Sequence, residues 1–219
     1  MASSKSKPTV SVVMPYYNRA HTVCNAIHSI LDQTYKNWEL VIVDDGSDDN
    51  EIEHIVRRFN DKRIRVYRTE HRGLVHARNH GNSNTKYDII MQQDSDDLSL
   101  PNRMEEMLNV MRWNDCDVVV SGLYINVWSD IQQCISRLYV SPPSHVNKEE
   151  LLIHQNIPGI PMYKKEVWKK KPFRMETQYA YDWMMWLDWA YSGFNIYCLR
   201  EGLYEYVRQE DSASIVFEK

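Results

Sequence analysis

The sequence predicts an α/β fold in which a mostly parallel, Rossmann-like sheet is flanked by helices and followed by a smaller C-terminal region. In residues 9–115, short apolar runs rich in β-branched residues alternate with segments of helical periodicity. Such an alternation builds parallel strands joined by right-handed crossover helices. After residue 116 the alternation breaks down. We therefore expect residues 9–219 to form a single domain, in which residues 116–219 pack against the sheet.

The elements of the first half follow from these runs. Strands are expected where a run would be buried on both faces of a sheet: Val10–Met14, Glu39–Val43, Ile64–Tyr67 and Asp88–Gln92. Helices are expected over His21–Gln33, from Asp48 through Phe59, and over Gly73–Gly81. Asp48 with Glu51 resembles a capping box. Another helix is expected to start at Ser99-Leu100-Pro101, with an apolar face of Met104, Met107, Leu108 and Met111.

The second half is expected to contain several strands and few helices. The predicted strands are Asp117–Val127, Cys134–Val140, Asn195–Leu199 and Leu203–Val207. Helices are predicted over Lys148–His154 and Tyr179–Tyr191, with a rigid loop at Pro158–Pro161 between them. At the other end of the chain, residues 1–8 are small and polar, which predicts disorder.

The composition is that of a globular protein, with 219 residues, 43% hydrophobic and 26% charged. The net charge of −4 gives no electrostatic basis for binding nucleic acid. The short basic run Lys169–Lys171 is expected to be a solvated helix end. Four cysteines without a Cys-x-x-Cys motif favour reduced thiols and a cytoplasmic protein. No apolar run reaches the ~18–20 residues of an integral membrane segment.

Asp94, Asp96 and Asp97 place three carboxylates within four residues, directly after the apolar run Ile89-Ile90-Met91. These charges repel one another, and a hard divalent cation that takes oxygen ligands would relieve the repulsion. The alternative is a solvated acidic turn in which an aspartate caps the next helix. The carboxyl ends of parallel strands lie at one edge of a sheet. The cluster should therefore converge on one cleft with Pro15-Tyr16-Tyr17-Asn18 and Asp44-Asp45.

The chain lacks the Gly-x-Gly-x-x-Gly and Gly-x-x-x-x-Gly-Lys-Ser/Thr phosphate motifs. It also lacks the Gly-x-Ser-x-Gly motif of hydrolase nucleophiles. Dinucleotide, P-loop and serine-hydrolase chemistry are therefore disfavoured. A parallel sheet with carboxylates at its edge instead suits a metal-bound nucleoside diphosphate.

Several stretches resemble the family 2 inverting glycosyltransferases, which have a GT-A fold. The segments Val10–Asn18, Ile27–Thr34 and Glu39–Ser47 are similar to the opening of that family, and Gly73–Gly81 is similar to its next motif. Asp94-Ser95-Asp96 matches its DxD metal motif. Asp182 with Trp183 and Trp186 matches the region of its catalytic base. The resemblance covers nearly the whole chain and is most specific in the first half, the expected nucleotide-sugar-binding half.

The resemblance implies a donor site for a nucleotide sugar. Asp45 would accept a hydrogen bond from a uracil or thymine imide N–H, or else stabilise a strand-end turn. Arg78 would face the acidic cluster or the diphosphate, or else be a surface arginine. Asp96 would ligate Mn²⁺ or Mg²⁺, Asp94 would brace the metal or bind the ribose, and Asp97 would cap or orient. Tyr17 would pack near the base. The implied donor-binding residues are Pro15, Tyr17, Asn18, Asp45, Arg78, Asp94 and Ser95.

The resemblance also implies an acceptor side in residues 116–219. Asp182 would be the general base that takes the acceptor's proton, unless it only caps its helix, and Asp188 is the next candidate. Trp183 and Trp186 could stack on sugar rings, with core packing expected for at least one. Two departures from the family are Tyr181, where a glutamate is frequent, and Gln209, where a histidine is frequent, ahead of Ser212 and Ser214.

The implied function is transfer of one sugar from a nucleotide sugar to a hydroxyl of a glycan or glycoconjugate. UDP-sugars are favoured, and dTDP-sugars also fit. The absence of Gln-x-x-Arg-Trp favours a non-processive enzyme. Two alternatives are a non-catalytic nucleotide-sugar-binding module and a nucleotidyltransferase, although the latter normally opens with a glycine-rich phosphate loop. No motif in the sequence identifies the transferred sugar, the acceptor or the oligomeric state.

Overall fold

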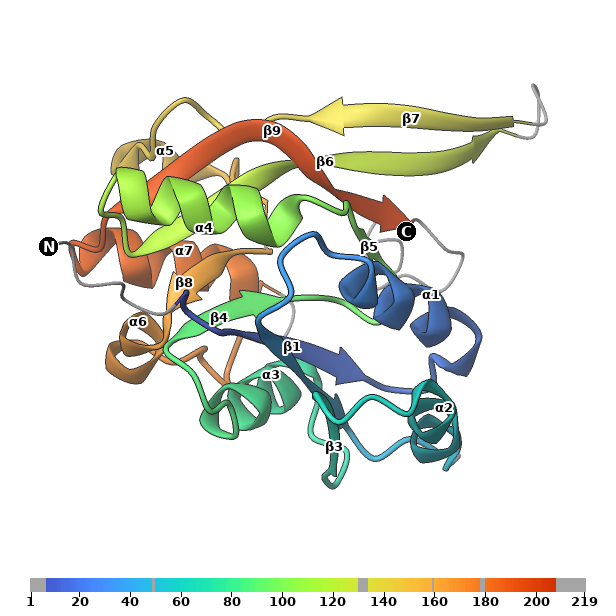
Figure 1. The fold of residues 1–219 in the computed structure, drawn as a ribbon. Coiled ribbons are helices and arrows are strands. Elements are labelled where there is room, and N and C mark those ends of the chain that lie inside the picture. The colour runs from blue at the N-terminus through green and yellow to red at the C-terminus, as the bar shows by residue number, and fades with distance from the viewer. Residues whose placement is uncertain (1–6, 49, 130–133, 159, 178–179, 208–219) are drawn as a thin grey trace, which may run out of the picture.

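A computed structural model describes the chain except for residues 1–6, 49, 130–133, 159, 178–179 and 208–219. One sheet runs through the molecule in the order β3-β2-β1-β4-β8-β6-β9-β5, and β7 pairs with β6 (Figure 1). The strands are β1 (Val10–Tyr16), β2 (Trp38–Asp44), β3 (Ile64–Arg68), β4 (Ile89–Gln92), β5 (Leu98–Ser99), β6 (Val118–Ser129), β7 (Cys134–Val140), β8 (Met162–Lys164) and β9 (Ile196–Val207).

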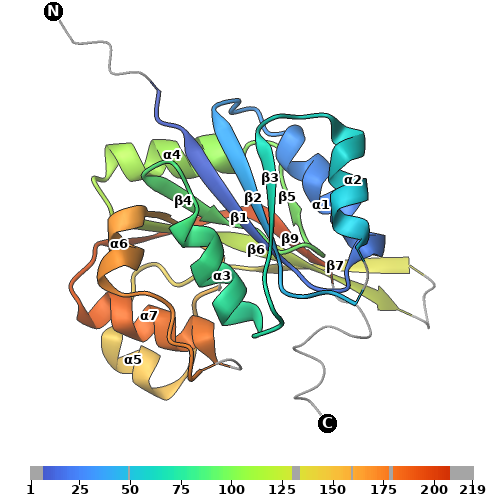
Figure 2. The same ribbon diagram turned by 90° about the horizontal axis from the view of Figure 1, so that it is seen from below.

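Helices cover both faces of this sheet (Figure 2). One apolar cluster joins the sheet to α1, α2 and α4, and a second joins its other face to α3, α5, α6 and α7. A two-sided cover buries strands completely, which explains the continuous apolar runs in the sequence. The helices are α1 (Ala20–Leu31), α2 (Glu51–Phe59), α3 (Leu74–Ser83), α4 (Arg103–Trp113), α5 (Lys148–Ile153), α6 (Lys165–Lys170) and α7 (Tyr181–Tyr191).

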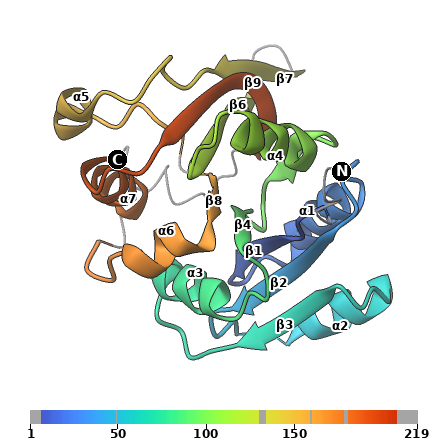
Figure 3. The same cartoon turned by 60° about the vertical axis from the view of Figure 1, so that its left-hand side comes forward.

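The expected α/β class is confirmed, and the sheet is mixed rather than purely parallel. Strands β1, β2, β3, β4, β6 and β9 run in one direction, whereas β5, β7 and β8 run in the other. The antiparallel β8 lies between β4 and β6 and joins the alternating half to the second half (Figure 3). Both halves of the chain therefore share one continuous sheet.

Three local predictions are wrong. Asp48 caps no helix, because α2 begins at Glu51 and Asp48 instead hydrogen-bonds with Asn18. The helix after Pro101 begins at Arg103, because Leu98–Ser99 pairs with β9 as strand β5. The last two predicted strands form one strand, β9, whose pairing with β6 shifts register near Gly122.

The remaining predicted elements are present with ends shifted by a few residues. The apolar face of Met104, Met107, Leu108 and Met111 is buried in the core. Strand β8 and helix α6 were not predicted, and Lys169 and Lys170 form the exposed end of α6. Residues 1–6, which belong to the N-terminal segment expected to be disordered, lie outside the described residues. Gly159, which belongs to the predicted rigid loop, also lies outside them.

Two expectations from composition can be compared with the structure. Cys24, Cys116 and Cys198 are free thiols, and the side chain of Cys134 lies outside the described part. Within the described residues, every helix is too short or too polar to cross a lipid bilayer.

The approach of α3 to the sheet gives a test of the packing. A Cβ atom at Gly81 would lie 2.4 Å from Val13 Cγ1 and 3.2 Å from Val43 Cγ2. We predict that Gly81→Ala lowers the free energy of unfolding by about 1–3 kcal/mol, the usual cost of overpacking a core. Urea denaturation measures this change. Ser83→Ala, on the exposed side of the same helix, is the control and should stay within about 0.5 kcal/mol of wild type. Equal stability of both variants would contradict this packing.

Candidate active site

The loops that follow β1 and β2 meet at the carboxyl edge of the sheet. The Asp45 N–H donates to Tyr16 O (2.9 Å), and the Asn18 N–H donates to Ser47 Oγ (3.0 Å). The Asn18 side chain also bonds Asp48 twice, at 2.7 and 3.0 Å. The structure therefore brings the predicted Pro15–Asn18 and Asp44–Asp45 segments together, although Pro15 itself is buried within β1.

Asp45 anchors the start of α3. Its Oδ1 accepts from the Arg72 N–H (3.1 Å), and its Oδ2 accepts from the Gly73 N–H (2.8 Å). Gly46 allows the close approach, because it has φ +68° and a Cβ there would lie 2.6 Å from His71 N. A carboxylate oxygen has further lone pairs. Asp45 thus holds the start of α3 with a side chain that is only 4% exposed, and its remaining lone pairs are the capacity with which it could accept from a ligand.

Aromatic and turn-forming residues complete this side of the site. The Tyr17 ring stacks on His71 with centroids 4.2 Å apart, and His71 Nδ1 lies 2.9 Å from Asp45 Oδ2. Tyr17 is exposed and could therefore present its outer face to a planar ring. The strand-end turn expected for Asp45 belongs instead to Asp44, whose Oδ1 accepts from the Ser47 N–H (2.9 Å).

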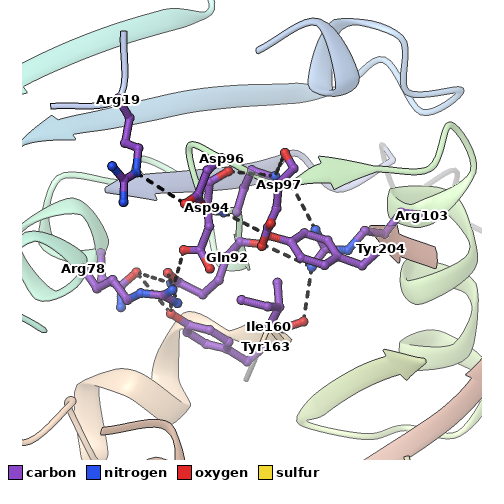
Figure 4. Close-up of polar contacts among 12 residues, drawn as sticks. Arg19, Arg78, Gln92, Asp94, Asp96, Asp97, Arg103, Ile160, Tyr163 and Tyr204 are labelled. Carbon is purple, nitrogen blue, oxygen red and sulfur yellow. Dashed lines mark hydrogen bonds and ion pairs between the residues drawn. The ribbon is translucent and has the colours of Figure 1, made fainter. Parts of the chain in front are cut away.

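The acidic turn Asp94–Asp97 follows β4 and is held in place by the second half of the chain (Figure 4). The Asp94 N–H donates to Tyr204 Oη (3.2 Å), and the Val207 N–H donates to Asp97 Oδ1 (2.8 Å). Asp97 is buried and contacts β9 rather than α4, which begins after Asn102. Asp97 therefore orients the turn and caps no helix, and Ser95 is also buried.

Two arginines approach the acidic turn from different elements. Arg78 Nη2 on α3 lies 2.5 Å from Asp94 Oδ1, and Arg19 Nε after β1 lies 3.4 Å from Asp96 Oδ2. Arg78 is only 1% exposed, so it faces the acidic cluster and is not a surface arginine. Burial raises the pKa of Asp96, and the charge of Asp94 raises it further despite Arg19. The turn therefore carries more negative charge than the nearby cations offset.

These side chains fit a hard divalent cation. Asp94 and Asp96 are each about a quarter exposed, at 24% and 23% of their side-chain surface. Among the residues that the structure describes, no cluster of three or more Asp, Glu, His or Cys side chains forms a metal cage. Mg²⁺ and Mn²⁺ commonly use one or two carboxylates and take their other ligands from substrate phosphates and water. Asp96 and Asp94 match that donor set.

Asp182 lies in the first turn of α7, a helix whose buried residues belong to the second apolar cluster. Its Oδ2 accepts from Gln155 Nε2 (2.7 Å), and its Oδ1 accepts from the Trp183 N–H (2.9 Å). Asp182 is therefore not the N-cap of α7, which is Ala180 without a side-chain cap hydrogen bond, although its Oδ1 bonds an N–H of the first turn and its Oδ2 bonds the loop that carries Gln155. Asp188 is engaged with Arg174, with Arg174 Nε 2.6 Å from Asp188 Oδ2.

The two tryptophans of α7 have different environments. Trp186 is fully buried and packs edge-to-face on Trp189, with ring centroids 5.8 Å apart. Trp186 therefore has the core-packing role that was expected for at least one of the two tryptophans. Trp183 is partly exposed, and its indole N–H donates to Leu151 O (2.5 Å). Only Trp183 stays a candidate acceptor contact.

Arg78 connects the acidic turn with the start of α7. Its guanidinium carbon lies 4.9 Å from the centre of the Tyr181 ring, and Tyr181 precedes Asp182. The same guanidinium pairs with Asp94. The Tyr181 side chain, at the position where the family often has glutamate, thus covers a buried cation.

Sequence reasoning missed several residues around the turn: Arg19, Gln92, Arg103, Tyr163 and Tyr204 (Figure 4). Arg19 carried a usable signal, since it directly follows Asn18 at a predicted strand end. Tyr204 carried none, because its contact with Asp94 spans 110 residues. Gln209, Ser212 and Ser214 lie outside the described residues, so the effect of Gln209 stays untested.

Fold and site together define a GT-A type α/β domain, and the comparisons agree. The family model described as glycosyl transferase family 2 matches residues 11–170. The chain is 30% identical to a putative glycosyltransferase, EpsE, of Bacillus subtilis, over 95% of this chain and 76% of EpsE. It is 32% identical to the O-antigen biosynthesis glycosyltransferase WbnJ of Escherichia coli, over 81% of this chain and 70% of WbnJ. The chain therefore belongs to glycosyl transferase family 2.

A solved structure shares the fold. Residues 1–349 of S. aureus TarS, in complex with UDP-GlcNAc, superimpose with a TM-score of 0.76 at 18% identity. The match covers 94% of this chain and 60% of the TarS chain. Relatives that match at least 81% of this chain are themselves covered over 58–76% of their length. The described domain thus corresponds to part of each longer relative.

The crowded negative charges of the acidic turn predict that the free energy of unfolding depends on pH. Burial raises the pKa of Asp97 well above its usual value, and Asp94 and Asp96 raise it further. A carboxyl with a higher pKa in the folded state loses stability as the pH rises from about 3.9, the unfolded value, through the folded value. In metal-free buffer, Asp97→Asn should therefore be more stable than wild type at about pH 7. The difference should shrink towards zero near pH 3–4.

Urea denaturation across this pH range measures the difference. Asparagine keeps the Oδ1 acceptor for the Val207 N–H, so the bond that orients the turn is retained. The control is Asp115→Asn, because Asp115 is fully exposed and has a positive φ that asparagine also adopts. A stability gain for Asp97→Asn that is equal at every pH would contradict a charge-based origin.

Proposed function

We propose that this chain is the catalytic domain of a metal-dependent, inverting glycosyltransferase that moves one sugar from a UDP-sugar to a hydroxyl of a glycan or glycoconjugate. The observation that carries the proposal is the double contact of Arg78. This buried cation pairs with Asp94 of the acidic turn and lies against Tyr181, next to Asp182. One residue thus connects the expected donor carboxylates with the expected catalytic base.

The donor side is supported by the loops around Asp45. Its carboxylate lies beside the stacked rings of Tyr17 and His71, where a flat base could be recognised at its face and its edge. A uracil or thymine imide N–H would donate to Asp45, so a UDP-sugar and a dTDP-sugar both suit the site. The fold similarity to TarS in complex with UDP-GlcNAc is compatible with UDP.

Asp96 would hold a Mn²⁺ or Mg²⁺ ion, with Asp94 beside it. When bound, the ion supplies positive charge that stabilises a diphosphate leaving group. Arg78 holds Asp94 in place through an ion pair in which the guanidinium is buried and the carboxylate is partly exposed. Asp97 and Tyr204 fix the backbone of the turn, so the carboxylates of Asp94 and Asp96 have a defined position.

Asp182 would accept the proton of the acceptor hydroxyl as that oxygen attacks the anomeric carbon. An alcohol is a poor nucleophile at neutral pH, and a positioned carboxylate removes this barrier. A single displacement of this kind inverts the anomeric configuration and requires no nucleophile from the protein. Trp183 next to Asp182 could contact an acceptor sugar.

A panel of nucleotide sugars tests the proposal against the alternative of a non-catalytic binding module. The protein should bind UDP-sugars in the presence of Mn²⁺, and it should hydrolyse or transfer at least one of them. Binding without any turnover, across the panel and a set of glycan acceptors, would favour the binding module. Absence of binding would remove both.

The metal prediction concerns Asp96. Asp96→Ala should abolish transfer and weaken Mn²⁺-dependent binding of UDP, because it removes the proposed ligand. The fold should persist, since the hydrogen bonds from the Asp94 N–H to Tyr204 Oη and from the Val207 N–H to Asp97 hold the turn at other positions. Calorimetry with UDP and Mn²⁺ measures the effect. Asp88→Ala, at the opposite end of β4, is the matched control. Full transfer in excess chelator would exclude metal dependence.

The base prediction concerns Asp182. Asp182→Asn keeps the side-chain shape and removes its charge, so transfer should fall by about 10²–10⁴-fold. Affinity for UDP and Mn²⁺ should change little. If Asp182 only caps α7, asparagine serves equally well and transfer should barely change. Asp188→Asn on the same helix is the control, because its carboxylate is paired with Arg174. Loss of transfer in that variant alone would move the base to Asp188.

A further inference from the structure

Arg19 is the second cation of the acidic turn, and it differs from Arg78 in its surroundings. Its Nε lies 3.4 Å from Asp96 Oδ2, and the two side chains are 21% and 23% exposed. Arg78 is almost completely buried and lies 2.5 Å from Asp94. One arginine is therefore enclosed by protein, whereas the other meets its carboxylate where solvent reaches both groups.

The contact between Arg19 and Asp96 has the features of a replaceable ion pair. The distance of 3.4 Å between Arg19 Nε and Asp96 Oδ2 is longer than the roughly 2.7–2.9 Å of strong arginine–carboxylate hydrogen bonds. Partly exposed pairs of this kind contribute little to stability. Asp96 is the residue that would hold the divalent cation. A guanidinium and a metal ion thus compete for the same carboxylate.

The backbone of Arg19 is fixed independently of its side chain. Its carbonyl oxygen accepts from the N–H groups of Thr22 (3.1 Å) and Val23 (3.0 Å) at the start of α1. The side chain itself is long and flexible, and it comes from the loop between β1 and α1, beside the turn (Figure 4). The guanidinium can therefore change partner while the helix start stays in place.

We infer that Arg19 is a diphosphate-binding residue that pairs with Asp96 in the absence of nucleotide and releases it when the nucleotide and its cation bind. This inference rests on the proposed function. Displaced from Asp96, the guanidinium stays at the edge of the same turn, where the phosphates of a metal-bound nucleoside diphosphate would lie. Arginine suits this role because its planar donors match phosphate oxygens. In both states the Asp96 carboxylate would have a cation beside it, which is the Arg19 guanidinium before binding and the metal ion afterwards.

The inference predicts opposite effects on two binding reactions. Arg19→Gln removes the competitor, so Mn²⁺ alone should bind about two- to five-fold more tightly, which corresponds to one exposed ion pair. With Mn²⁺ saturating, UDP should bind about ten-fold or more weakly, because a charged hydrogen bond to phosphate is lost. Uridine, which has no phosphate, should bind as it does to wild type. A role only in folding would move all three affinities in the same direction.

The experiment titrates metal-free protein with Mn²⁺, read from the electron paramagnetic resonance signal of the free ion, and then with UDP or uridine by calorimetry. Arg19→Lys keeps the charge and should retain most of the UDP affinity. Arg57→Gln removes an exposed arginine on α2 and should leave every affinity unchanged. Thermal unfolding of each variant confirms that α1 is intact.

The outcomes separate the inference from the proposed function. If wild type does not bind UDP with Mn²⁺, both are overturned. If wild type binds UDP with Mn²⁺, but Arg19→Gln binds Mn²⁺ alone no more tightly or UDP no more weakly, the inference fails and the proposed function stands. Opposite shifts of the two affinities in Arg19→Gln, with Arg57→Gln unchanged, support the exchange.

Discussion

The ion pair between the buried Arg78 and the partly exposed Asp94 is the interaction on which the site depends. Three carboxylates within four residues would push a turn apart, and a fully buried guanidinium at 2.5 Å neutralises the first of them. Removing one partner of such a pair leaves an uncompensated charge in the interior, which is strongly destabilising. The position of α3, and with it the loop that Asp45 holds, is thereby tied to the position of the acidic turn.

The second half of the chain supplies the rest of the turn's support. Strand β9 contributes the Tyr204 hydroxyl and the Val207 N–H, and β8 places Tyr163 beside Gln92, the last residue of β4. Parallel strands alone would leave the turn at an open sheet edge. The antiparallel β8 and the long β9 supply these contacts, and the carboxylates of the turn that stay accessible are Asp94 and Asp96.

The sequence predicted the parallel half well because strands covered on both faces must be apolar along their whole length, as β1 and β2 are. It also predicted that the polar segments after β1, β2 and β4 lie close together, since the carboxyl ends of parallel strands share one edge of a sheet. It missed β8, which has only three residues and exists through its pairing with β4 and β6. It split β9 because Arg200-Glu201-Gly202 interrupts the apolar pattern where the register shifts. The extent of such strands depends on their pairing with distant strands, and the local sequence pattern does not contain that information.

Tyr181, at a position where the family often has glutamate, determines how Arg78 contacts the second half of the chain. A glutamate there would place a second anion beside the Arg78 guanidinium and would compete with Asp94 for it. A tyrosine ring instead contacts the cation through its face, at 4.9 Å, and leaves the ion pair with Asp94 intact. Because Tyr181 begins α7, the same contact fixes the first turn of the helix that carries Asp182. Arg78 therefore contacts both the acidic turn and the start of α7, so one side chain connects the carboxylates of the turn with the helix that carries Asp182.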